Sequence, residues 1–202
     1  MKFKNNFYNL DLDWVNNVQV NLSAVERRTA TLVKRRSVKK EYQASWLLKA
    51  ITLIDLTTLS GDDTFGKVDR LCQKALNPIA SHILEKLEIN KNSLSVGAVC
   101  VYHHLVQQAK KQLKGQLPIA AVSTGFPAGL SSYSTRKKEI IDSIKSGATE
   151  IDIVINRGFV IQNNWQKLYD EVKSFKLAAK GKKIKAILGV GDLETMRNVA
   201  KA

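Results

Sequence analysis

The stretch G-A-T-E-I-D-I-V-I-N, residues 147–156, decides the fold class of this chain. Side chains alternate between the two faces of a strand, so three isoleucines share one face: Ile151, Ile153 and Ile155. Asp152 and Val154 then lie on the other face. Apolar residues on both faces predict a strand that is covered on both sides, as in a parallel sheet packed by helices.

This predicted strand carries one acid, Asp152, in its middle. An ionised carboxylate in such a place costs several kcal/mol unless it is paired or hydrogen-bonded. Glu150 can reach water at the strand start, whereas two β-branched residues follow Asp152. Taken alone, the stretch allows two interpretations: a structural aspartate that caps a neighbouring loop, and an acid aimed into a site. Parallel α/β folds place such sites at the C-terminal ends of their strands.

The composition is that of one globular domain. The chain has 202 residues, of which 44% are hydrophobic and 25% charged, and this length can bury a sizeable core. The net charge of +14 is scattered, apart from one dense basic run within residues 27–40. Zinc-finger spacing, aromatic RNA-binding strands and a helix-turn-helix signature do not occur, so we do not expect a nucleic-acid partner. A phosphorylated substrate explains the positive charge equally well.

Cysteine usage and hydropathy predict the compartment. Cys72 and Cys100 show neither metal-ligand spacing nor a disulfide framework, which fits a reducing compartment. The sequence contains no recognisable signal peptide and no run of 18 apolar residues. We therefore expect a cytoplasmic protein with no membrane partner.

Strand-like and helix-like segments alternate along the chain after residue 50. Strands are expected at 51–59, 96–102, 119–123, 147–156 and 184–189. Helices are expected at 68–76, 79–87, 105–113, 135–145 and 165–179, with a last helix capped by residues 191–194. This order predicts an α/β fold with a parallel sheet or barrel at residues 51–202, preceded by a basic, helical arm at residues 1–50.

Two features favour a barrel over an open sheet. Four of the expected strands carry a polar residue at mid-strand or near their end: Asp55, Cys100, Asp152 and Lys185. Such residues suit a shared interior or mouth. The loops after the strands are also rich in glycine or polar residues, and T-G-F-P-A-G at 124–129 is placed to approach a ligand with backbone N–H groups.

Five segments of the chain form a recognisable set: I-D-L-T-T-L with D-D-T, A-V-C-V-Y, G-F-P-A-G, G-A-T-E-I-D-I-V-I-N and I-L-G-V-G-D-L. In this order and spacing they together resemble the deoxyribose-phosphate aldolases, in their animal-type form. The resemblance covers residues 51–202. It implies a (β/α)₈ TIM barrel and a class I aldolase of deoxyribonucleoside catabolism that needs no metal or other cofactor. The implied reaction is reversible cleavage of the phosphorylated sugar 2-deoxyribose 5-phosphate to glyceraldehyde 3-phosphate and acetaldehyde.

The resemblance also implies roles for individual residues. Carbon–carbon cleavage beside a carbonyl needs an electron sink, which a protonated lysine imine supplies, and a positioned acid–base that moves protons. By resemblance, Asp152 is that proton relay. Asp55, Thr57, Cys100 and Lys185 match positions that line the substrate site. We expect cationic lysines nearby to keep the Asp152 carboxylate ionised.

Two lysine segments of the family do not occur in these 202 residues. The family carries its Schiff-base lysine in K-T-S-T-G on strand six and a second lysine in G-F-K-P-A-G-G on strand seven, and neither segment is present. Gly189-Val190-Gly191 also departs from the family, which usually has a threonine before the glycine. The chain thus resembles the first five of eight βα units.

Three functional hypotheses follow. The first is a class I aldolase represented incompletely, with no turnover by this polypeptide alone. The second is a catalytically inactive, aldolase-derived binding or scaffold protein. The third is a basic α/β protein associated with nucleic acid. The sequence leaves homo-oligomerisation open. For the fold, we expect five parallel strands in sequential order, with helices outside and the four polar strand residues pointing inward.

Overall fold

A five-stranded parallel sheet forms the centre of the molecule. The computed structural model describes residues 8–35, 37–90 and 93–202. The strands are β1 (Asp55–Thr57), β2 (Ala98–Tyr102), β3 (Ile119–Ser123), β4 (Glu150–Val154) and β5 (Lys183–Ile187). They pair in the order β1-β2-β3-β4-β5, and every pair is parallel. The predicted strand order is confirmed.

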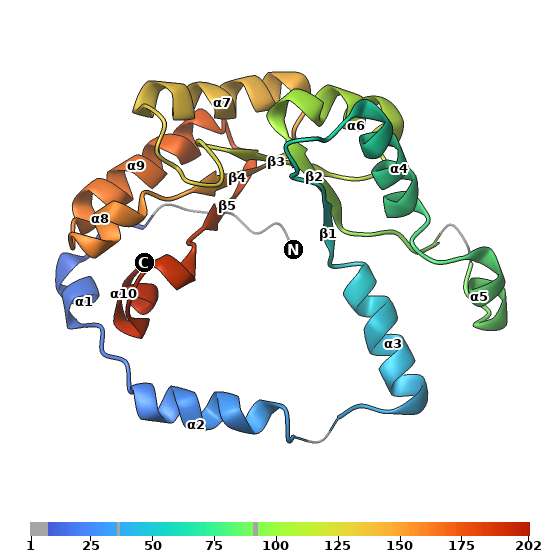
Figure 1. The fold of residues 1–202 in the computed structure, drawn as a ribbon, viewed down its shortest axis with the longest axis horizontal. Helices are drawn as coiled ribbons and strands as arrows, with labels where there is room; N and C mark the ends of the chain where they lie inside the picture. The colour runs from blue at the N-terminus through green and yellow to red at the C-terminus, as the bar shows by residue number, and fades with distance from the viewer. Residues whose placement is uncertain (1–7, 36, 91–92) are drawn as a thin grey trace.

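The helices that follow the strands are α4 (Phe65–Leu76), α5 (Ser81–Lys86), α6 (Val106–Leu113), α7 (Tyr133–Ser146), α8 (Arg157–Ile161), α9 (Trp165–Ala178) and α10 (Met196–Lys201). Of these, α4, α6, α7 and α9 cover one side of the sheet (Figure 1). Short 3₁₀ turns occur at η2 (His103–Leu105) and η3 (Val190–Asp192). Within the described part of the chain, no helix is long and apolar enough to span a membrane.

The main hydrophobic core lies between the sheet and these helices. Val99, Val101, Ile151 and Ile153 have no exposed surface and belong to one cluster with Phe175 of α9. Their odd numbers reflect the alternation of the strands, which sends these side chains to the helix-covered face. The even-numbered residues of β2–β4 therefore occupy the opposite, inner face.

Threonine hydroxyls close both ends of the ladder between β3 and β4. At one end, Thr124 Oγ1 accepts a hydrogen bond from Val154 N (2.6 Å) and donates to Val154 O (3.1 Å). At the other end, Thr149 Oγ1 accepts from Ile119 N (2.8 Å) and donates to Ile119 O (3.2 Å). Each threonine hydroxyl thus adds two hydrogen bonds between β3 and β4, the strand that carries Asp152.

The described part of the N-terminal arm contains three helices, of which the first buries a residue in a core and the third packs only its last, partly buried residue, Ile51, against one. They are α1 (Leu12–Asn17), α2 (Leu22–Leu32) and α3 (Lys40–Ile51). Val15 of α1 is buried in a second cluster with Ile155, Trp165 and Leu193. By contrast, α2 and α3 contain no buried residue, and α2 runs past the side of the sheet that faces away from α7 (Figure 1).

The observed elements differ from the expected ones in three places. The strand expected at 51–59 is limited to β1, because Ile51 ends α3 and the Thr52 hydroxyl caps Lys49 O (2.7 Å). Helix α8 was not expected; the Asn156 side chain starts it by accepting from Gly158 N. The last helix is capped by Thr195, whose side chain accepts from Asn198 N, and residues 191–194 lie in or beside the η3 turn instead.

Candidate active site

Carboxylates from two strands converge on Lys185. Lys185 Nζ donates a hydrogen bond to Asp55 Oδ2 and lies 3.1 Å from Asp152 Oδ1 and 3.8 Å from Glu150 Oε2. Strand pairing places Asp152 directly beside Lys185. The cluster lies on the inner face, away from the helix-covered core. The prediction that Asp55, Asp152 and Lys185 point inward is confirmed.

The contact between Asp55 and Lys185 also shows that the sheet is curled. Asp55 lies on β1 and Lys185 on β5, the two edges of the sheet. In a flat sheet, strands four positions apart are separated by roughly 19 Å, because neighbours lie about 4.8 Å apart. A lysine side chain does not bridge that span. The strands therefore curve around the cluster, as in the wall of a barrel.

Asp152 is enclosed on this inner face. Its side chain is 13% exposed, and Oδ1 accepts no aligned hydrogen bond within the described residues although the Lys185 ammonium is at ion-pair distance. Burial raises the pKa of Asp152, and the charge of Lys185 opposes this only in part. We expected lysine charge to dominate and keep the carboxylate ionised. Desolvation has the larger effect, because the acid lies in mid-strand.

Lys185 is held as an ammonium ion. Burial alone would lower its pKa, but the hydrogen bond to Asp55 and the charge of Asp152 outweigh burial and raise the pKa. A lysine that attacks a carbonyl must lose its proton and needs a lowered pKa. The surroundings of Lys185 therefore suit a fixed positive charge that orients Asp55 and Asp152. They do not suit a nucleophilic lysine.

Cys100 and Thr57 complete the group of predicted residues. Cys100 Sγ donates to Asp152 Oδ2 at 3.8 Å, which places the buried thiol against the acid. Burial, with the charge of Asp152, raises the pKa of Cys100 to about 12, so the thiol stays protonated. Thr57 pairs with Cys100 in the sheet, and its hydroxyl donates to Asp55 O (2.7 Å).

An apolar wall lies beside the charged cluster. Ala120 and Val122 of β3 form a small cluster with Cys100, against which Tyr102 and Phe126 pack. The Tyr102 and Phe126 rings meet edge to face, with centroids 5.9 Å apart. The inner face thus offers charged groups on β4 and β5 next to an apolar surface on β2 and β3.

The loop 124–129 is held by its own contacts. We expected its backbone N–H groups to face a ligand. Gly125 N instead donates to Glu139 Oε2 (2.8 Å), and Gly129 N donates to Gly125 O (2.8 Å). The loop contributes the Phe126 ring to the inner face, while these two amides stabilise the loop itself.

Glu150 is the residue of the cluster that the sequence did not identify. We expected it near water, but its side chain is 12% exposed and lies 3.1 Å from Lys183 Nζ as well as near Lys185. Its two-residue spacing from Asp152 was the available signal, because it places both acids on one face. Across the described residues, no group of three or more His, Cys, Asp or Glu side chains is arranged to hold a metal ion.

A curled parallel βα sheet with ionisable groups on its inner face is the architecture of the TIM-barrel class. The family model for DeoC/LacD family aldolases matches residues 49–197. The chain belongs to this family. The five βα units agree with the partial barrel that the sequence predicted.

Two mammalian relatives are similar over almost the whole chain. A deoxyribose-phosphate aldolase of Mus musculus is 51% identical over 196 residues, which cover 96% of this chain and 62% of the mouse protein. A deoxyribose-phosphate aldolase of Homo sapiens is 48% identical over the same lengths. The chain therefore spans about 62% of the length of these relatives.

Solved structures share the fold at low identity. A structure from Coccidioides immitis, provisionally described as a deoxyribose-phosphate aldolase, has a TM-score of 0.66 at 22% identity and covers 95% of this chain and 66% of that chain. A tetrameric deoxyribose phosphate aldolase from Aeropyrum pernix has a TM-score of 0.50 at 19% identity, covering 70% and 53%.

Proposed function

We propose that the chain supplies the first five βα units of a deoxyribose-phosphate aldolase, with Asp152 as its proton relay. The observation that carries the proposal is the enclosed Asp152, ion-paired to Lys185 on the inner face of a curled sheet, in a chain 51% identical to such an aldolase. The substrate would be 2-deoxyribose 5-phosphate, cleaved to glyceraldehyde 3-phosphate and acetaldehyde.

The surroundings of Asp152 suit proton transfer. A general acid–base works best when its pKa approaches the working pH, and burial moves the pKa of Asp152 in that direction. Each oxygen of the Asp152 carboxylate has its own partner: Lys185 lies beside Oδ1, and the Cys100 thiol donates to Oδ2. Asp55 and Thr57 would bind hydroxyl groups of the sugar from β1, and the apolar wall would face its carbon chain.

The electron sink would come from a lysine imine, and the described residues offer no suitable lysine on this face. Lys185 is the lysine of the cluster, and its raised pKa keeps it protonated. We therefore expect the chain alone to show no turnover. Borohydride reduction in the presence of 2-deoxyribose 5-phosphate, followed by mass spectrometry, should find no adduct. An adduct on Lys185 would contradict this assignment.

The proposal is tested by completing the barrel. Residues 1–202 would be joined to the part of the mouse relative that follows the matched residues. The completed chain should cleave 2-deoxyribose 5-phosphate, and Asp152→Asn should lower kcat by ~10²–10⁴ with little change in KM. Glu194→Gln, an exposed carboxylate outside the cluster, is the matched control and should leave kcat unchanged.

A folded but inactive completed chain would overturn the aldolase proposal and favour the binding or scaffold protein. A second outcome would overturn only the role of Asp152. If Asp152→Asn lowered the melting temperature but left activity per folded molecule near normal, the carboxylate would be structural.

A further inference from the structure

The linker between α2 and α3 presents an exposed serine, Ser37, next to basic residues. The sequence of this stretch is K-R-R-S-V, residues 34–38. Ser37 is exposed and belongs to no helix or strand. Arg36 contributes its charge to the sequence, but its placement lies outside the described residues. A solvent-exposed connector of this kind can enter the active site of another enzyme without unfolding the core.

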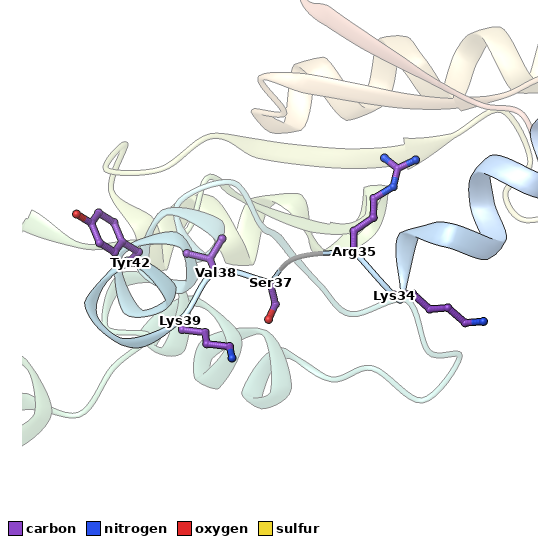
Figure 2. A pocket seen from close by; sticks show the side chains of 6 residues that line it. All are labelled: Lys34, Arg35, Ser37, Val38, Lys39 and Tyr42. Carbon is purple, nitrogen blue, oxygen red and sulfur yellow. The ribbon is translucent and has the colours of Figure 1, made fainter.

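The same segment lines a hollow of about 700 Å³ on the arm. Its walls are Lys34, Arg35, Ser37, Val38, Lys39 and Tyr42 (Figure 2). In this view, the Ser37 hydroxyl and the Lys39 side chain extend to the same side of the linker, and Lys34 and Arg35 extend from its α2 end. The serine hydroxyl is thus reachable and has cationic groups on both sides.

These cations are not neutralised by acids of the arm. Arg35 Nη2 donates to the Thr31 hydroxyl at 3.1 Å, which is a neutral partner. Among the described residues, no carboxylate lies at ion-pair distance from Lys34, Arg35 or Lys39. Unpaired arginine and lysine side chains at short range favour binding to carboxylate or phosphate groups.

We propose that Ser37 is the phosphoacceptor site of a serine/threonine protein kinase that recognises basic residues N-terminal to its target. The cations of Lys34 and Arg35 would bind acidic groups of the kinase, and Val38 would follow the acceptor as an apolar contact. In the transfer, Ser37 Oγ attacks the γ-phosphorus of Mg-ATP and a new Oγ–P bond forms. The bond from the γ-phosphorus to the β,γ-bridging oxygen breaks, ADP leaves, and the hydroxyl proton passes to the kinase aspartate.

Two threonines of α2 have similar basic residues before them and serve as an internal comparison. Arg27 and Arg28 precede Thr29 and Thr31. Both hydroxyls are already donated to helix carbonyls, Thr29 Oγ1 to Glu26 O (3.0 Å) and Thr31 Oγ1 to Arg28 O (2.7 Å). Their backbone is helical, whereas a kinase binds an extended segment. The fold therefore selects Ser37 over these threonines.

The added phosphate would change the charge of the arm where helix α3 begins. A phosphoserine carries about −1.5 to −2 charges at pH 7 and accepts hydrogen bonds from arginine and lysine. Lys39 is the N-cap residue of α3, and no side chain caps this helix end. A phosphate on Ser37 lies two residues before that cap, where the positive end of the helix dipole attracts an anion.

The test uses the 202-residue chain, the catalytic subunit of cyclic-AMP-dependent protein kinase, and Mg-ATP, with phosphosites located by tandem mass spectrometry. We expect one phosphate per chain, at Ser37. Ser37→Ala should abolish incorporation, whereas the double variant Thr29→Ala/Thr31→Ala should keep it. Arg35→Ala should slow the reaction about tenfold, the usual effect of losing one charge-assisted hydrogen bond.

A urea-unfolded sample, diluted into the kinase reaction just before labelling, tests the selection by the fold. Thr29 and Thr31 should gain phosphate in the unfolded sample and remain unmodified in the folded one, whose helicity is checked by circular dichroism. Phosphate on these threonines in the folded chain at the level of Ser37, or a folded chain unmodified at Ser37, would overturn the proposal.

Discussion

The two faces of the sheet differ in what fills them. The helix-covered face is closed by apolar side chains such as Ile151, Ile153 and Phe175, none of which has exposed surface. On the inner face, Asp152, which lies between Ile151 and Ile153 on β4, contacts Lys185 of the neighbouring β5. Strand alternation alone separates these environments. Substitutions on the first face should therefore affect folding, and substitutions on the second should affect ionisation.

The largest effect should come from the helix-covered face. Phe175 packs against the Tyr133 ring, with centroids 6.0 Å apart, and under the Arg136 guanidinium, 5.4 Å from its centroid. Phe175→Ala should lower the free energy of unfolding by about 3–5 kcal/mol, because the cavity cannot collapse fully. Urea unfolding followed by circular dichroism measures it. Leu177→Ala, at a 63% exposed position of the same helix, should change stability by less than about 0.5 kcal/mol.

An intermediate effect on the free energy of unfolding is expected at the buried ion pair between α7 and α9. Arg136 Nη2 donates to Glu171 Oε1, and both side chains are 6% exposed. Glu171→Gln should cost about 2–3 kcal/mol, because it leaves a buried guanidinium charge without its counter-ion. The double variant Arg136→Met/Glu171→Leu should recover part of this loss in the same unfolding assay. A double variant less stable than Glu171→Gln would show that the charges themselves are needed.

The smallest effect on stability should come from Asp152 on the inner face, whose contribution decreases as the pH rises. Folding raises the pKa of Asp152 above 3.8, so the folded chain binds this proton more tightly than the unfolded chain. Asp152 therefore favours folding at low pH and disfavours it as the pH rises through the raised pKa. Asp152→Asn should remove this pH dependence and leave stability at pH 7 unchanged or slightly higher. Urea unfolding between pH 3 and pH 8 measures both.

Asp142 offers a control of opposite sign. The hydrogen bond from Lys138 lowers the pKa of this exposed carboxyl. Asp142 therefore favours folding above its unfolded pKa, and this contribution is lost as the pH falls. Asp142→Asn should reduce stability slightly at neutral pH and not at low pH. Equal pH profiles for the two Asn variants would mean that the faces do not differ as described.

Buried strands between clear turn signals were predictable from sequence, and elements fixed by side-chain caps were not. Residues 119–123 match β3 because five small or apolar residues lie between turn signals. Residues 51–54 are equally apolar, but helix α3 extends through Ile51, which hydropathy does not reveal. The inward direction of Asp152 followed from its neighbours. The enclosure of Glu150 depends on Lys183 and Lys185 of another strand, and sequence spacing holds no information about that contact.

The threonine hydroxyls at the ends of β3 and β4 make the hydrogen bonding of these strands sensitive to a slip of one residue. A slip of one residue between these strands would break the contacts of Thr124 with Val154 and of Thr149 with Ile119 at the same time. It would also turn Asp152 toward Phe175 and the helices. Misaligned forms of this sheet thus lose four hydrogen bonds and bury a carboxylate among apolar side chains. The alignment of lowest free energy is therefore also the one that presents Asp152 to the inner face.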